Sequence, residues 1–164
     1  MAFSACDSNP AGKYDLYGRW SCKIDSRNIN GTEIINLSPD STLVMIDSLR
    51  YSAFSSRWGM AVDARIKTSG KWYTRNDSLM LVLEQTEIRT DSSSFSLHVT
   101  DFSSALTDEL KDSMSADFCT AVFDELSTLY TAGNRKLINL GKIEFLTQDS
   151  MLVRNGANYT CLTR

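Results

Sequence analysis

The residues able to do chemistry are few in this chain of 164 residues, and no spacing brings them into a known catalytic pattern. His98 is the one histidine. With Asp101 and any of the many serines it supplies the residue types of a Ser-His-Asp triad. No nucleophile elbow presents a serine for attack, and no Gly-rich loop could cradle a phosphate. Acidic residues fall mostly at turns, where aspartate is expected for backbone reasons. The sequence therefore predicts no enzyme, and His98 is expected to be an ordinary strand residue.

The cysteines raise the questions of a metal site and a disulfide. Cys22, Cys119 and Cys161 have spacings that match no zinc pattern, so we expect no metal and no other cofactor. Cys22 lies in the first strand-like run and Cys161 in the last. A barrel that closes its first strand on its last would make the two neighbours, able to form a disulfide. The alternative is two separately buried thiols, and Cys119 is expected to be a core thiol on a helix.

Composition and charge narrow the class of protein. An apolar content of 42% is ordinary for a folded domain, and a chain of this length buries about 70% of its unfolded surface. The net charge of −3 is spread along the chain without a basic stretch, which argues against a nucleic-acid partner. No run approaches the roughly 20 apolar residues of a membrane helix. Abundant Ser, Thr and Asp between apolar runs suit short strands joined by polar turns.

The N-terminal residues 1–16 are expected to form a flexible tether. The segment "MAFSAC" places small and apolar residues directly before Cys6, and a polar stretch with Gly and Pro follows. It resembles the end of a bacterial lipoprotein signal, whose lipobox puts small residues before a lipidated cysteine. This implies a bacterial cell-envelope protein, anchored through Cys6 on the periplasmic side or the cell surface and touching the membrane only through its acyl chains. An incidental cysteine in a disordered N-terminus is the alternative.

From residue 17 the apolar pattern predicts one domain, residues 17–164, built mainly from strands. Residues 57–67 alternate most cleanly, with Trp58, Met60 and Val62 on one face, as in a half-buried antiparallel strand. Turns are expected at "TSG" (68–70), "RND" (75–77) and the Ser-rich stretch 91–94. Other strand-like runs span 17–25, 32–37, 42–51, 71–74, 79–84, 95–99, 137–147, 150–154 and 158–163.

In an insert at about residues 103–133, the spacing of the apolar residues changes from that of a strand to that of a helix. Its apolar stripe includes Leu110, Met114, Phe118, Val122 and Leu126. Thr107 is expected to cap the helix, Gly133 to end it, and residues 113–115 to allow a break into two helices. Together these elements predict a mainly β protein, an antiparallel up-and-down barrel of about 8–10 strands with a helical insert before the last strands.

Four segments in order resemble the lipocalin-like family of calycin barrels, most closely the small lipocalin-like lipoproteins of Bacteroidota-type bacteria. The resemblance covers residues 17–164, and only the long helical insert departs from secreted lipocalins. The matching segments are "YGRW", "LSPDSTLVM", "SGKWYTRNDSLMLVLE" and "FLTQDSMLVRNGANYTCLTR". The resemblance implies that Gly18 lets the chain pass close beneath the barrel and that Trp20 seals the closed end. It also implies that Arg164 packs across the Trp20 ring.

The family resemblance and the apolar strands suggest a ligand cavity inside the barrel. The expected function is therefore binding of a small hydrophobic molecule without bond chemistry, since such sites are mostly apolar. The alternative is a barrel filled by its own side chains, serving as a structural or interaction module whose protein partner the sequence does not indicate. The expected cavity wall is Met45, Trp58, Met60, Val62, Trp72, Leu81 and Leu83.

Overall fold

The computed structural model describes residues 16–100, 107–131 and 136–164. These residues form eight antiparallel strands in up-and-down order, which close into a barrel, and a helix between the fifth and sixth strands. The predicted fold class is confirmed. Among the described residues, no helix combines the length and the apolar character needed to cross a membrane. The elements are β1 (Gly18–Asp25), β2 (Ile29–Leu37), β3 (Thr42–Phe54), β4 (Trp58–Arg75), β5 (Ser78–Val99), α1 (Asp108–Thr131), β6 (Lys136–Leu146), β7 (Ser150–Asn155) and β8 (Asn158–Thr163).

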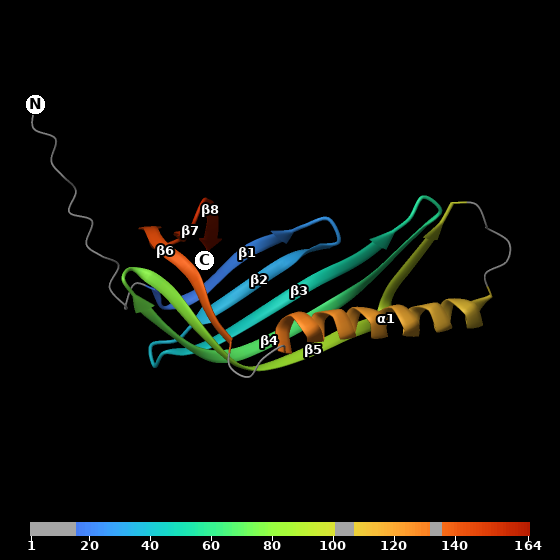
Figure 1. Ribbon diagram of the computed structural model, residues 1–164, viewed down its shortest axis with the longest axis horizontal. Coiled ribbons are helices and arrows are strands. Elements are labelled where there is room, and N and C mark those ends of the chain that lie inside the picture. Colours follow the sequence, from blue (N-terminus) through green and yellow to red (C-terminus); the bar gives the residue numbers. More distant parts are fainter. Residues whose placement is uncertain (1–15, 101–106, 132–135) are drawn as a thin grey trace, which may run out of the picture.

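The strands have very unequal lengths, and this gives the barrel two different ends (Figure 1). β3, β4 and β5 have 13, 18 and 22 residues, whereas β7 and β8 have 6 each. β6 pairs with β5 only as far as Leu83, and β1 meets β8 through the pair Ser21 and Thr163. Past Leu83, α1 runs back along β5 in place of a strand. One end is therefore a ring of strands, and the other is an extended sheet covered by a helix.

Two of the three expected turns in the middle of the chain are wrong. β4 continues through residues 68–70, and β5 continues through residues 91–94. Both places carry register shifts between β4 and β5, so the extra residues are absorbed as bulges instead of reversing the chain. Gly70 is needed for the first, because a Cβ there would lie 2.0 Å from the carbonyl oxygen of Val82. The third expected turn is present, with Asn76 and Asp77 at positive φ between β4 and β5.

Trp20 is fully buried at the ring of strands, and we call this region the Trp20 end. The indole Nε1 donates to the carbonyl oxygen of Leu16 at 2.9 Å. The predicted contact with Arg164 is present, with the guanidinium carbon 4.4 Å from the ring centroid and an N–H donated to the carbonyl oxygen of Tyr17. Gly18 has φ +131, and a Cβ there would lie 3.4 Å from Nε of Arg164. The buried members of this Trp20 cluster are Leu16, Trp20, Ile35, Leu37, Leu43, Met45, Trp72, Leu79, Leu81, Leu83, Met151, Val153 and Leu162.

At the other end, which we call the helix end, α1 covers the inward face of the long strands. Thr107 caps the helix as predicted, since its Oγ1 accepts from the backbone N–H of Leu110 at 3.3 Å. The expected break at residues 113–115 is absent, and Gly133 lies outside the described residues. Tyr51 donates to the carboxylate of Glu125 and joins β3 to the helix. The buried members of this helix cluster are Leu49, Tyr51, Val62, Ala64, Ile66, Phe118, Cys119, Val122 and Leu126.

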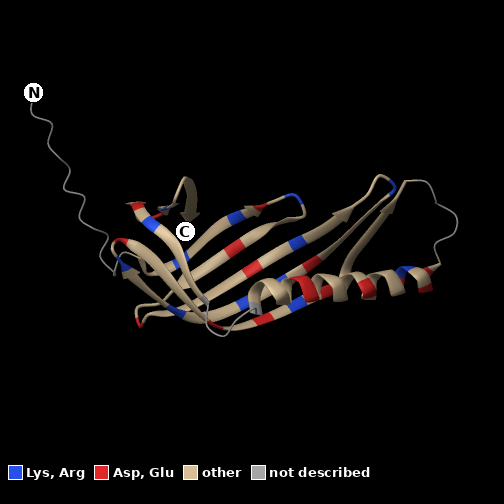
Figure 2. Cartoon of the chain, viewed as in Figure 1, with Lys and Arg blue, Asp and Glu red and all other residues tan. Residues whose placement is uncertain are grey.

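Charged residues of both signs are interspersed along the strands and the helix (Figure 2). On the outer face, Arg50 donates to Asp63 at 2.8 Å and to the Ser96 hydroxyl at 2.7 Å, which ties β3 to β5 across the bulge. Arg154 of β7 pairs with Glu144 of β6 at 2.7 Å. Because these pairs are substantially exposed, they orient neighbouring strands and add little to the free energy of unfolding.

Candidate functional site

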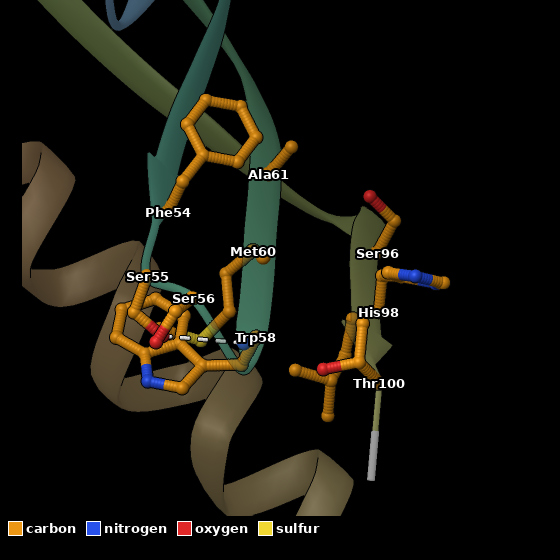
Figure 3. A pocket seen from close by; sticks show the side chains of 11 residues that line it. Phe54, Ser55, Ser56, Trp58, Met60, Ala61, Ser96, His98 and Thr100 are labelled. Atoms are coloured by element: carbon orange, nitrogen blue, oxygen red, sulfur yellow. Dashed lines mark hydrogen bonds between the residues drawn. The ribbon is translucent and has the colours of Figure 1, made fainter.

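A pocket of about 290 Å³ lies at the outer tip of the three long strands (Figure 3). The register places Phe54 of β3, Gly59 of β4 and His98 of β5 side by side across the sheet. Phe54 is 68% exposed and leans over Gly59, where a Cβ would lie 3.3 Å from its ring. The full lining is Phe54, Ser55, Ser56, Trp58, Gly59, Met60, Ala61, Ser96, Leu97, His98 and Thr100.

The turn between β3 and β4 fixes the shape of this tip pocket. The Ser55 hydroxyl accepts from the backbone N–H groups of Arg57 and Trp58, each at 3.2 Å. The backbone N–H of Ser55 in turn donates to the carbonyl oxygen of Trp58 at 2.8 Å. In Figure 3, Phe54 and Ser55 stand on one side of the pocket, and His98 stands on the opposite side. Phe54 and His98 therefore share one face of the sheet, whereas Trp58, Met60 and Leu97 are the alternate residues of β4 and β5 that complete the lining.

The seven residues expected to form one cavity wall fall into three places. Met45, Trp72, Leu81 and Leu83 belong to the packed Trp20 cluster. Val62 is buried in the helix cluster, and Met60 packs against it. Trp58 is 39% exposed and, with Met60, lines the tip pocket.

Trp72, expected to be the clearest wall residue, is held by polar and aromatic contacts. Its side chain is 1% exposed, and its indole Nε1 donates to the carbonyl oxygen of Ser38 at 3.0 Å. The ring of Tyr17 meets it edge to face, with the centroids 5.9 Å apart. Trp72 therefore takes part in closing the Trp20 end, in company with Trp20.

A second polar site lies inside the barrel, between the Trp20 cluster and the helix cluster. Glu33 of β2 and Asp47 of β3 are directly opposite each other in the register. Asp47 is 1% exposed, and its Oδ2 accepts from the hydroxyl of Tyr130 on α1 at 3.1 Å. The thiol of Cys22 on β1 donates to Glu33 Oε1 at 3.5 Å. In the described part of the chain, no donor reaches Asp47 Oδ1.

Burial and mutual repulsion shift the pKa values of this group. Burial, followed by the charge of Glu33, raises the pKa of Asp47 to about 7; the Tyr130 hydrogen bond opposes the rise, and a hydrogen bond to Glu33 adds to it. Burial also raises the pKa of Glu33. Burial and the nearby Glu33 carboxylate raise the pKa of Cys22 to about 12, so this thiol is not an activated nucleophile. Burial and the nearby Asp47 charge raise the pKa of the Tyr130 hydroxyl.

The expected alternative of a Cys22–Cys161 disulfide is not realised, since both residues are free thiols. Cys22 points into the barrel toward Glu33, whereas Cys161 is exposed beside the buried Leu162. Alternation along β8 puts neighbouring side chains on opposite faces, so Cys161 points outward and away from Cys22. The alternative of two buried thiols is also wrong for Cys161. Cys119 is buried on α1 as predicted.

The sequence contained a signal for the acid pair that periodicity alone could have shown. Asp47 lies in phase with the inward-facing Met45 and Leu49, where an apolar residue is the rule. The tip pocket had a weaker signal, because the alignment of Phe54 with His98 across Gly59 depends on a bulge that the sequence does not reveal. The described residues bring no three His, Cys, Asp or Glu side chains together in an arrangement that could hold a metal ion.

Comparison with known proteins adds nothing to these observations. No protein-family model matches the chain, and no curated protein matches its sequence. The class of protein that the geometry defines is an up-and-down antiparallel barrel with one helix laid against its long strands.

Proposed function

We propose that this protein binds a small apolar or aromatic molecule non-covalently in the tip pocket. The observation that carries the proposal is a cavity of about 290 Å³ whose lining includes Phe54, Trp58, Met60 and Leu97. Ligand sites in proteins are mostly hydrophobic with a few polar anchors, and a volume near 300 Å³ is at the small end of their range. His98 and the nearby hydroxyl groups would provide those anchors. No bond is formed or broken in this function.

Saturable binding of N-phenyl-1-naphthylamine, a neutral fluorescent probe, tests the proposal. We expect its fluorescence to rise on binding and Ala61→Trp to weaken binding at least 10-fold, because the indole would occupy the pocket. Thr160→Trp, at an exposed position near the start of β8, is the matched control and should leave the affinity unchanged. Linear, non-saturating fluorescence, or equal affinity in both variants, would contradict the proposal. Native mass spectrometry of protein from its own cells would then identify a natural ligand.

The wider proposal is a lipocalin-like protein of the bacterial cell envelope, anchored through Cys6. It is supported by the up-and-down barrel, by the glycine at positive φ shortly before Trp20, and by Arg164 packed across the Trp20 indole. Cys6 lies outside the described residues. Mass analysis of the N-terminus from the native host tests the anchor. Cleavage before Cys6 with added acyl mass is expected, and an unmodified, uncleaved terminus would rule it out.

One observation favours the alternative of a filled barrel that docks a protein partner. The Trp20 end is packed with side chains, while Phe123 and Leu129 of α1 are 42% and 53% exposed. In that case the probe would not bind the tip pocket. The substitutions Phe123→Ser and Leu129→Ser would then release a partner recovered by crosslinking in the native host, without changing the melting temperature by more than a few degrees.

A further inference from the structure

Part of the inner face of the barrel, along β1 and β2, is less deeply buried than the rest. Alternate residues of every strand point inward, and on β3 and β4 these inward residues are buried. On β1 and β2, by contrast, Cys22, Ile24, Ile29 and Glu33 are only partly buried, although they face the same interior. The helix accounts for the difference, since α1 contacts β4 and β5. The acid pair therefore lies where the partly buried inner face of β2 meets the fully buried inner face of β3.

The acid pair carries negative charge that no described residue neutralises. Neither Glu33 nor Asp47 forms an ion pair with a described lysine, arginine or histidine. The titratable groups facing the pair are Cys22 from β1 and Tyr130 from α1, both donors and neither positively charged at neutral pH. On the neighbouring strands, the inward hydroxyls of Thr68 and Thr86 contact each other. Below about pH 7 the proton of Asp47 can bridge it to Glu33. Once that proton is lost, a buried carboxylate oxygen without a donor is costly, so the arrangement then favours a ligand that brings both a proton donor and a positive charge.

We propose that Glu33 and Asp47 form a second binding site, inside the barrel, for a protonated organic amine with an apolar body. The ammonium group would donate to the unpartnered Oδ1 of Asp47 and to Glu33, and its charge would balance theirs. Ile24 and Ile29, which are partly buried on the same inner surface, would contact the apolar body. A bare divalent metal fits less well, because it needs six or more oxygen ligands or several nitrogen and sulfur ligands. This site is separate from the tip pocket and does not depend on it.

Calorimetric titration with hexylamine tests the proposal, with 1-hexanol as the neutral compound of the same chain length. At pH 8 we expect hexylamine to bind the wild-type protein at least 10-fold more tightly than 1-hexanol. Asp47→Asn and Glu33→Gln should each weaken hexylamine binding at least 10-fold, while Glu87→Gln, an exposed carboxylate of β5 paired with Arg89, should not change it. Below pH 7 a proton would compete with the amine for the pair, so binding should weaken and should release protons to the buffer.

The outcomes separate this site from the tip pocket. Asp47→Asn should leave N-phenyl-1-naphthylamine binding unchanged, and Ala61→Trp should leave hexylamine binding unchanged. Equal affinity for hexylamine and 1-hexanol, or full retention of hexylamine binding in a folded Asp47→Asn protein, would overturn the amine site. Folding of each variant is checked by its circular dichroism spectrum and melting temperature. If Asp47→Asn fails to fold, the Glu33→Gln titration decides alone.

Discussion

At the Trp20 end, strands from both termini form a ring around a buried indole, whereas at the helix end three long strands depend on a helix to cover them. The first end is held by contacts between the two ends of the chain and between neighbouring strands. Arg164 lies over Trp20, and the indole N–H of Trp72 donates a hydrogen bond to the loop before β3. The second end packs α1 against β3 and β4, from which the helix is far apart in the sequence. Polar and ligand-accessible features gather at the second end and at the boundary between the two. The difference is that one end is closed by its own packed side chains, whereas the other leaves pockets and polar groups partly uncovered.

The largest effect should come from removing the indole at the Trp20 end. Trp20→Ala is expected to lower the free energy of unfolding by about 3–5 kcal/mol, because a fully buried side chain is replaced by a cavity. Trp58→Ala, at the 39% exposed tip, should cost less than about 1 kcal/mol. Urea denaturation of both variants measures the comparison. A loss under 1 kcal/mol for Trp20→Ala would show that this indole does not hold the ring of strands together.

The next effect should show how much the helix contributes. Leu126 and Leu129 lie on the same helix, but Leu126 is 1% exposed and Leu129 is 53% exposed. Leu126→Ala should lower the free energy of unfolding by about 2–5 kcal/mol, and Leu129→Ala by less than about 0.5 kcal/mol. Hydrogen exchange should also be faster along the outer half of β5 in Leu126→Ala. Unchanged exchange there would mean that α1 does not protect the strand beside it.

Much of the Trp20 end was predictable from the sequence, and much of the helix end was not. Gly18, Trp20 and Arg164 belong to short segments with recognisable patterns, and the strands beside them have lengths that local periodicity fixes. The sequence predicts turns within β4 and β5, because Gly70 and the serines near residue 94 are turn-forming residues, but in the structure they lie at bulges. Sequence composition does not distinguish a bulge from a turn, since both use the same residue types.

The candidate site was less predictable than the fold. Apolar alternation places side chains on the inner face of a strand but does not say whether that face is packed or open. Met45 and Trp72 are inward-facing and packed, whereas Trp58 is at a tip and exposed. The packing depends on how far each strand extends past its neighbours and on where the helix lies. Both are tertiary properties, so neither follows from periodicity.

A smaller effect tests the boundary between the two ends through pH. The folded protein holds the Asp47 proton up to about pH 7, whereas the unfolded chain releases it near the ordinary value of 3.8. Between these values the folded state binds more protons, so stability falls as pH rises through this window. We expect wild-type stability to be higher at pH 5 than at pH 8 by about 1–3 kcal/mol, and Asp47→Asn to lose most of that difference. Urea denaturation at both pH values measures it. An equal pH dependence in Asp47→Asn would assign the effect to other groups.

The smallest effect concerns the start of α1 and asks whether the helix end depends on local capping or on tertiary packing. Thr107 Oγ1 accepts from the backbone N–H of Leu110, one of the groups that the first helical turn leaves without a partner. Thr107→Ala should therefore cost about 0.5–2 kcal/mol. Thr120→Ala is the control, because the Thr120 hydroxyl is exposed and donates only to a carbonyl of its own helix. A loss confined to Thr107→Ala in urea denaturation would mean that the cap helps to hold α1 on the sheet. Equal, negligible losses would mean that the buried face formed by Phe118, Val122 and Leu126 positions the helix alone.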